Sequence, residues 1–223
     1  MTQFKQITHV IYDMDGLLLG TESINEQVNS QIVQHYGKNF SRSVKAKIAG
    51  RSALKSAQII IDLLELPLTP QAYVEERQKL ICHLYPQAQP LQGAVSLTKH
   101  LHRHGIPQAV ASSSSRLPFE LKTTHHREWF GLFECIVLGD DPAVAQSKPA
   151  PDIFLVAAQR LGASPEQCLV FEDSVAGMEA AKAAQMSVVV VPDPDLEWSF
   201  YQQADQILNC LDDFDPSQWG LPT

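Results

Sequence analysis

Five short apolar runs recur along the chain. They lie at residues 10–12, 109–111, 136–138, 169–171 and 188–191. Near-continuous apolar runs of this length are typical of strands that are buried on both faces of a parallel sheet. Helical patterns of apolar and polar positions separate the later runs, at residues 94–104, 149–161 and 175–184. The alternation of strand and helix predicts an α/β fold with a doubly wound parallel sheet.

Helix-ending and helix-starting residues flank these patterns. Gly105 and Gly162 follow two of the helical segments, where a left-handed residue ends a helix. Ser174 precedes the third segment as a capping residue. The last residues, 212–223, carry no clear periodicity, and we expect a loosely packed tail with Trp219 as its anchor.

One interval interrupts the alternation. A crossover between parallel strands needs only about a dozen residues, yet residues 13–108 separate the first two apolar runs. Within this interval, amphipathic helices are predicted at residues 23–36, 53–66 and 71–85, and Thr69 and Pro70 form a cap and first-turn pair before the third. We therefore expect a Rossmann-like core of residues 1–20 and 87–223 with an inserted helical cap domain at residues 21–86.

Composition narrows the class of protein. The chain has 223 residues, 44% of them hydrophobic and 19% charged, which is the range of globular proteins. A formal net charge of -8 argues against binding to a nucleic acid polymer or to an anionic membrane. The polar first residues contain no signal peptide, and the four cysteines form no CxxC pair. We expect a cytoplasmic protein in a reducing compartment, either a monomer or a weak dimer.

Chemically active side chains follow the predicted strands at the point where each strand ends. They are Asp13 and Asp15 after the first run, Ser112 and Ser113 after the second, Lys148 after the third, and Glu172 and Asp173 after the fourth. Ligands of open α/β sheets bind beyond the carboxyl ends of the strands, so these residues are expected to converge on one crevice. Carboxylates, a hydroxyl pair and one ammonium group together suit a divalent cation and a phosphate.

The predicted site favours magnesium. Oxygen ligands without a nearby histidine or cysteine favour Mg²⁺ over zinc. A carboxylate about 4 Å from a phosphate dianion is repelled by roughly 8 kcal/mol at an effective dielectric constant of about 20. Attack by a carboxylate therefore requires that Mg²⁺ and Lys148 neutralise the phosphate, while Ser112 and the backbone N–H of Ser113 hold its remaining oxygens.

These motifs resemble a known family. The run from Asp13 to Gly16, then Ser112, then Lys148 with Pro149, then Glu172 with Asp173, resembles the four ordered motifs of haloacid dehalogenase-like phosphatases. The helical insertion after the first motif also matches. Residues 13–19, 104–107, 137–142 and 169–173 are similar to the pseudouridine-5′-phosphatase subgroup of that family. The resemblance extends over nearly the whole chain.

The resemblance implies a role for each motif residue. Asp13 is the expected nucleophile, which forms an aspartyl-phosphate, and Asp15 is the expected acid and base. Ser112 and Lys148 are expected to bind the phosphoryl group. The cap is expected to close over the substrate, with Arg51 as its substrate ligand, although a surface arginine remains the competing interpretation. The expected Mg²⁺ ligands are Asp13, the carbonyl of Asp15 and Asp173, with Glu172 as support.

The chain also departs from the family pattern at several positions. Gly20 stands where an Asp is usual, at the start of the cap, and its freedom is expected to loosen the hinge. Ala150 and Gln92 replace an Asp and a Pro. Gln185 replaces a Gly in a helix-ending position, where a left-handed backbone costs a residue with a side chain about 1 kcal/mol. None of these changes removes a catalytic atom.

Three functions are compatible with the sequence. The favoured one is hydrolysis of a small phosphorylated metabolite, with pseudouridine 5′-phosphate or a related nucleotide or sugar phosphate as the expected substrate. A sugar phosphomutase of the β-phosphoglucomutase type uses the same four motifs but transfers the phosphoryl group to another hydroxyl. A non-catalytic binding protein that retains the fold is the third. Phosphate release distinguishes the first from the other two.

Overall fold

The computed structural model describes residues 7–48, 51–193 and 197–223, and a parallel sheet lies at its centre. Neighbouring strands follow the order β3-β2-β1-β4-β5-β6, and every neighbouring pair is parallel. The five predicted strands are confirmed. The sixth was missed because it has only two residues and no apolar run. The bounds are β1 His9–Tyr12, β2 Gln108–Ser112, β3 Cys135–Leu138, β4 Cys168–Glu172, β5 Ser187–Val190 and β6 Gln206–Ile207.

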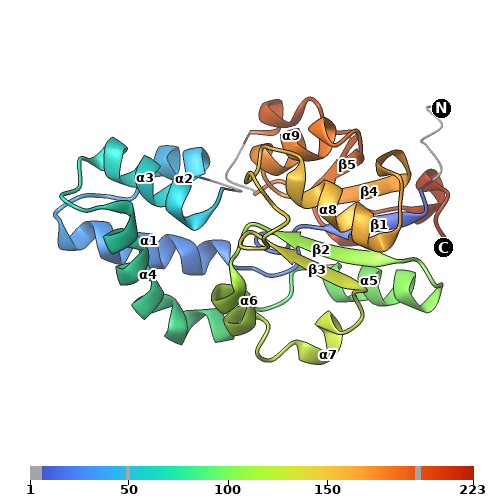
Figure 1. Ribbon diagram of the computed structural model, residues 1–223, viewed down its shortest axis with the longest axis horizontal. Helices are drawn as coiled ribbons and strands as arrows, with labels where there is room; N and C mark the ends of the chain where they lie inside the picture. The colour runs from blue at the N-terminus through green and yellow to red at the C-terminus, as the bar shows by residue number, and fades with distance from the viewer. Residues whose placement is uncertain (1–6, 49–50, 194–196) are drawn as a thin grey trace.

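Helices cover both faces of the sheet (Figure 1). Val10 and Tyr12 of β1 belong to the hydrophobic cluster that also contains residues of α5, α6 and α7, whereas Ile11 belongs to the cluster formed with α8 and α9. This division follows from the alternation of side chains along a strand. The bounds are α5 Ala94–Arg103, α6 Arg116–Lys122, α7 Arg127–Phe130, α8 Asp152–Leu161 and α9 Val175–Ala183.

The helices inserted after β1 have a hydrophobic cluster of their own, separate from the two beside the sheet. They gather beyond one end of the core in Figure 1. Thr69 accepts a hydrogen bond from the N–H of Ala72 at 3.2 Å, so the predicted cap before α4 is confirmed. The short α2 was missed because Val44 is its only buried residue. The bounds are α1 Glu22–His35, α2 Arg42–Ile48, α3 Ala53–Leu64, α4 Pro70–Leu84 and the 3₁₀-helix η1 Tyr85–Gln87.

Two chain segments connect the cap helices to the core, and they lie side by side. The N–H of Gly20 donates to the carbonyl of Gln89 at 2.8 Å, and the N–H of Leu91 donates to the carbonyl of Leu18 at 3.0 Å. Gly20 therefore lies in a hydrogen-bonded connection, and the expectation that it loosens the hinge stays a prediction. The α/β fold with an inserted helical cap is confirmed, and the limits of 21 and 86 stay a prediction.

The remaining helical turns are short 3₁₀ segments. No helix among the described residues is long and apolar enough to cross a membrane. All four cysteines are free thiols. The bounds are η2 Pro165–Gln167, η3 Trp198–Tyr201, η4 Leu211–Asp213 and η5 Pro216–Trp219.

The C-terminal tail is packed more closely than the sequence predicts. Trp219 is only 1% exposed, and Leu211, Phe214 and Leu221 are also buried in the cluster that contains β1. The prediction of a loosely packed tail is wrong. Its apolar residues lie on irregular turns, so neither a helical nor a strand period reveals them.

The structure confirms a left-handed backbone at Gln185, where φ is 63°. Its N–H donates to the carbonyl of Lys182, and the N–H of Met186 donates to that of Ala181, which closes the end of α9. We expect Gln185→Gly to relieve about 1 kcal/mol of strain. Glycine also makes the unfolded chain more flexible, which offsets part of this gain. A net rise of about 1–2 °C in Tm is expected in thermal unfolding.

Gln202→Gly is the matched control, because Gln202 has an ordinary right-handed backbone with φ of -61°. The control is expected to lower Tm, since glycine there adds only unfolded-state entropy. A Gln185→Gly protein that melts no higher than the native chain would contradict the strain argument.

Candidate active site

The site lies where the order of the strands reverses. The chain runs from β1 outward to β2 and β3, then returns to β4 on the other side of β1. Asp13 follows β1, Glu172 ends β4 and Asp173 comes next. Ligands of doubly wound sheets bind at this switch point. A cavity of about 570 Å³ lies there, lined by Asp13, Asp15 and Asp173 on the core side and by cap residues on the other.

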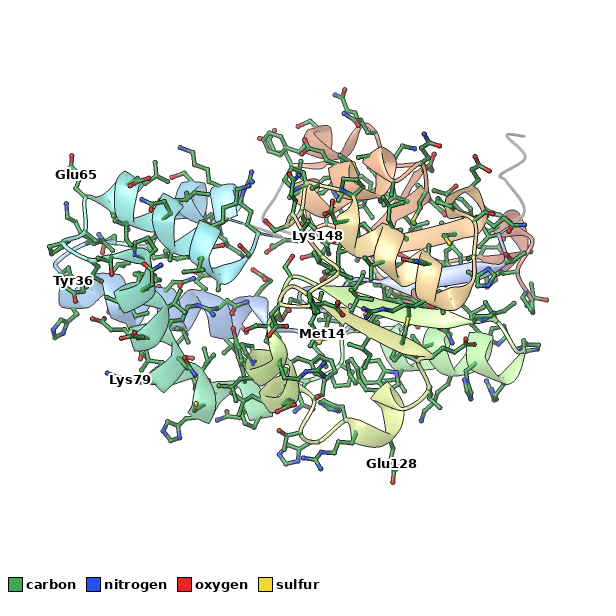
Figure 2. The ribbon with its side chains drawn as sticks, viewed as in Figure 1. Met14, Tyr36, Glu65, Lys79, Glu128 and Lys148 are labelled. Atoms are coloured by element: carbon green, nitrogen blue, oxygen red, sulfur yellow. The ribbon has the colours of Figure 1, made fainter. Side chains whose placement is uncertain are left out.

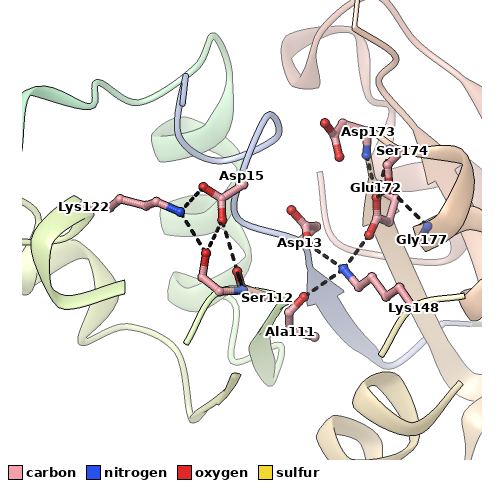
Figure 3. Close-up of polar contacts among 11 residues, drawn as sticks. Asp13, Asp15, Ala111, Ser112, Lys122, Lys148, Glu172, Asp173, Ser174 and Gly177 are labelled. Carbon is pink, nitrogen blue, oxygen red and sulfur yellow. Dashed lines mark hydrogen bonds and ion pairs between the residues drawn. The ribbon is translucent and has the colours of Figure 1, made fainter. Parts of the chain in front are cut away.

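Lys148 holds the two strand ends together (Figure 3). Its Nζ donates to Asp13 Oδ1 at 2.5 Å, to Glu172 Oε1 at 2.6 Å and to the carbonyl of Ala111 at 3.2 Å. The side chain is 1% exposed. Burial lowers the pKa of Lys148, but the charges of Asp13 and Glu172 outweigh it and the net pKa is raised. Lys148 is therefore a fixed cation at the floor of the cavity.

Glu172 is fully occupied by protein donors. Its Oε2 accepts from the N–H groups of Asp173 and Ser174 and from the Ser174 hydroxyl, each at 3.0 Å. Ser174 also caps α9 by accepting from the N–H of Gly177, as predicted. A side chain at Gly177 would collide with the Glu172 carboxylate, so this position needs glycine. Glu172 fixes the position of Lys148. The expectation that Glu172 also supports the Mg²⁺ site stays a prediction.

Asp13 and Asp173 have carboxylate oxygens that face the cavity. Asp13 uses Oδ1 for Lys148, and no donor among the described residues reaches the Asp173 carboxylate. Burial raises the pKa of Asp173 well above its usual range, and the negative charges of Glu172 and Asp13 raise it further. The pKa of Asp13 is also raised by burial, against the opposing effect of Lys148. Two buried carboxylates with unfilled acceptor sites fit a hard cation.

The predicted Mg²⁺ site depends on few side-chain ligands. Within the described ranges, no group of three or more His, Cys, Asp or Glu side chains is arranged to bind a metal ion. The predicted Mg²⁺ set needs only two side chains, those of Asp13 and Asp173, and adds the backbone carbonyl of Asp15. Mg²⁺ in proteins commonly keeps water and substrate phosphate as its other ligands. The residues present therefore fit Mg²⁺.

Asp15 is held by four donors. Oδ1 accepts from Lys122 Nζ at 2.5 Å and from the Thr21 hydroxyl at 2.8 Å. Oδ2 accepts from the Ser114 hydroxyl at 2.9 Å and from the Ser112 hydroxyl at 3.2 Å. Burial raises the pKa of Asp15, but the Lys122 charge and these hydrogen bonds outweigh it and lower the pKa overall. Asp15 is a carboxylate in this arrangement.

Sequence reasoning missed Lys122. It is 2% exposed, it also donates to Ser114 Oγ at 2.8 Å, and its Nζ lies 4.4 Å from the ring centroid of Tyr85. A lysine in a seven-residue helix has no motif around it. The one available signal is Phe119, which lies three residues earlier on the same helix face and is buried.

The serines of the predicted phosphate loop differ in their surroundings. Ser112 is fully buried and donates to Asp15, whereas Ser113 and Ser115 line the cavity, and Ser114 does both. A side chain at Gly139 would collide with the carbonyl of Ser113, so glycine there lets the loop approach β3. The phosphate contacts predicted for Ser112 and Ser113 stay predictions.

Arg51 lies on the cap side of the same cavity. Its Nε donates to the carbonyl of Lys47 at 3.0 Å. Gly50, with which it was paired in sequence, lies outside the described residues. The structure thus brings the predicted core residues together at one crevice, with Arg51 in the facing wall. The cluster comprises Asp13, Asp15, Ser112, Ser113, Lys148, Glu172 and Asp173.

A buried carboxylate pair and a lysine at the switch point of a parallel sheet are suited to binding a phosphorylated ligand. Residues 7–185 match the model of a hydrolase family, the haloacid dehalogenase-like hydrolases. The chain belongs to this family, and the resemblance noted from the motifs is confirmed.

Relatives that match nearly the whole chain carry phosphatase names. Two proteins of Arabidopsis thaliana are named (DL)-glycerol-3-phosphatase: the first is 44% identical, covering 97% of this chain and 74% of the relative, and the second 45% identical, covering 97% and 92%. A Drosophila melanogaster protein with the name "Probable pseudouridine-5'-phosphatase" is 42% identical, covering 98% of this chain and 96% of the relative. The predicted enzyme class, a phosphatase of this family, is thereby confirmed.

Solved structures confirm the fold. A family IA hydrolase from Entamoeba histolytica superimposes with a TM-score of 0.82 and 22% identity, covering 96% of this chain and 98% of that one. A β-phosphoglucomutase from Clostridium difficile gives a TM-score of 0.81 at 20% identity, covering 96% and 97%. At these identities the likeness speaks for the fold alone.

Proposed function

We propose that this protein is a Mg²⁺-dependent phosphomonoester hydrolase that works through an aspartyl-phosphate on Asp13. The observation that supports it best is the asymmetry of the Asp13 carboxylate. Oδ1 is fixed by the buried Lys148, while the carboxylate lines the cavity. A nucleophile needs one oxygen oriented by the protein and the other directed at the substrate.

Two steps follow from this geometry. Asp13 attacks phosphorus and the bond from phosphorus to the ester oxygen breaks. The leaving alcohol takes a proton from Asp15, which must first take up that proton from solvent when the substrate binds, because Asp15 is a carboxylate in the free protein. Water then attacks the aspartyl-phosphate, Asp15 takes its proton, and inorganic phosphate leaves with Asp13 regenerated. The donors around Asp15, from Thr21, Lys122 and the serines, orient its carboxylate for this second proton transfer.

The phosphate charge must be neutralised before a carboxylate can approach it. Asp13, the Asp15 carbonyl and Asp173 would hold Mg²⁺, which supplies charge neutralisation and alignment of the phosphate. Lys148 supplies a second cation, and Ser112 and Ser113 would hold phosphoryl oxygens.

The substrate is a small phosphorylated metabolite. Relatives named for glycerol 3-phosphate, pseudouridine 5′-phosphate and fructose 1-phosphate support this class. Pseudouridine 5′-phosphate or a related nucleotide or sugar phosphate stays the predicted substrate, with Arg51 as its ligand from the cap. Release of inorganic phosphate favours this function over the mutase, which returns a phosphorylated sugar, and over a binding protein, which shows no turnover.

Metal removal tests the proposal. Phosphate release from a metabolite panel is expected to fall by about 1,000-fold or more in excess EDTA, because the carboxylates of Asp13 and Asp173 then repel the phosphate. Excess Mg²⁺ is expected to restore the rate. It is also expected to raise Tm, by an amount that grows with the Mg²⁺ concentration above its Kd.

Asp173→Asn serves as the companion variant, since it removes one metal ligand and leaves Asp13 and Lys148 in place. Its half-saturating Mg²⁺ concentration is expected to rise by about 10-fold or more. Native activity that survives complete chelation would refute the magnesium requirement.

A further inference from the structure

Three polar side chains from three cap elements meet in the wall of the cavity that also contains the catalytic carboxylates. Arg77 of α4 donates through Nη2 to Asn25 Oδ1 at 2.5 Å and to the Tyr85 hydroxyl at 2.9 Å. The Tyr85 hydroxyl in turn donates to Asn25 Oδ1 at 2.7 Å. All three residues line the same cavity as Asp13 and Asp15. The mechanism described above uses none of them.

The Arg77 guanidinium has donors to spare. Among the described residues, no carboxylate lies within ion-pair distance of Arg77, and Nη2 alone makes its hydrogen bonds. A guanidinium carries five N–H donors in a fixed plane, so Nε and Nη1 have hydrogen-bonding capacity for a ligand. A cation of this kind in a cavity wall is suited to a ligand that brings oxygen acceptors.

The cluster lies close to the catalytic group. The ring of Tyr85 has the Arg77 guanidinium carbon 5.8 Å and Lys122 Nζ 4.4 Å from its centroid. Lys122 holds Asp15. A substrate whose phosphate reaches Asp13 can place its alcohol portion at this cluster, because both line one cavity of about 570 Å³.

Acceptors lie beside these donors. Glu22 and Glu26 of α1, on either side of Asn25 in the sequence, line the cavity. Their negative charges, offset at Glu26 by Lys45 at 3.9 Å, disfavour a second anionic group on the substrate. A hydroxyl group both donates and accepts, so adjacent hydroxyls can meet the carboxylates and the guanidinium together.

We propose that Asn25, Arg77 and Tyr85 form a subsite that binds the hydroxyl groups of the substrate's alcohol portion, so that the enzyme selects monophosphates of polyols, sugars or nucleosides. This inference rests on the proposed phosphatase function and deepens it. Arg77 is a specificity residue, since it contacts the substrate away from the reacting atoms.

The test compares two substrates of equal carbon number, glycerol 3-phosphate and n-propyl phosphate, which lacks the hydroxyls. The native enzyme is expected to prefer the hydroxylated ester in kcat/KM. Arg77→Met is expected to lower this preference by about 10- to 100-fold, the loss of hydrogen bonds to a charged group, with the larger part in KM. Asn25→Ala provides a second variant with the same expected direction. Lys79→Met is the matched control on the same helix, because Lys79 is exposed on the outer surface and does not line the cavity (Figure 2).

Each outcome decides one question. No phosphate release from any ester by the native protein with Mg²⁺ refutes the proposed function itself. An equal loss for both esters in Arg77→Met and Asn25→Ala, with Lys79→Met unchanged, overturns the hydroxyl subsite and makes the cluster a structural support. A native preference for 3-phosphoglycerate over glycerol 3-phosphate that disappears in Arg77→Met also overturns it, in favour of a site for a second anion.

Discussion

Asp13→Asn is expected to lower kcat by about 10,000-fold or more while leaving the protein folded. The amide offers no anionic oxygen, so the covalent step is lost and only binding and electrostatic effects remain. Asp13 is buried, and burial already raises the pKa of its carboxyl, so a neutral side chain of the same shape is tolerated there. Lys148 keeps Glu172 as its anionic partner. We therefore expect a Tm within a few degrees of the native value.

Phosphate release and thermal unfolding together check this expectation. Asp15→Asn is the informative companion. Without its acid, Asp13 accepts the phosphoryl group more slowly, but the phosphoenzyme then accumulates because water attack lacks its base. In that variant, mass spectrometry after a rapid quench is expected to show one added phosphoryl group on the peptide that contains Asp13. The double variant is expected to show none.

Residual activity distinguishes the alternatives. If Asp13→Asn and native protein release phosphate at the same rate, a contaminating phosphatase accounts for the signal. If Asp15→Asn carries a phosphoryl group on another residue, Asp13 is not the nucleophile. A phosphoenzyme that transfers its group to a sugar in place of water would support the mutase.

The strand ends were predictable from the sequence because their positions follow from topology. Asp13, Lys148 and Asp173 each come directly or shortly after a buried apolar run, and parallel strands bring their carboxyl ends to one edge. The positions of these residues after successive strands were therefore enough to predict the core part of the site. The left-handed Gln185 was predicted in another way, from the family pattern, because a Gly is usual at this helix-ending position.

Site residues that depend on packing between distant segments could not be predicted from the sequence. Lys122 meets Asp15 only because α6 lies beside the connection to the cap, and Arg77 meets Asn25 across 52 positions of the chain. Neither has a neighbouring motif, and both read as ordinary solvated charges on a helix. Short elements such as α2 and β6 were missed for a related reason, since too few residues show a period.

Lys148→Met is expected to reduce both activity and stability. Three carboxylates, those of Asp13, Glu172 and Asp173, remain buried around a position that has lost its cation. Breaking a buried ion pair by removing one partner costs about 3–5 kcal/mol, which corresponds to a Tm lower by roughly 10 °C in a chain of this size. The rate of phosphate release is expected to fall by about 1,000-fold or more, because Asp13 loses its orientation and the phosphate loses a cation.

The stability loss should respond to charge. Mg²⁺ is expected to restore part of Tm, since a divalent cation offsets the same carboxylates, and Glu172→Gln in the Lys148→Met background is expected to restore part of it by removing one charge. Neither is expected to restore the rate.

Lys182→Met is the control: its ion pair with Asp205 at 3.0 Å is about one-third exposed, so its loss is expected to change stability by less than about 1 kcal/mol. A Lys148→Met protein with native Tm and rate would show that the buried lysine neither holds the carboxylates together nor takes part in the chemistry, and the nucleophile proposed at Asp13 would lose its orienting partner.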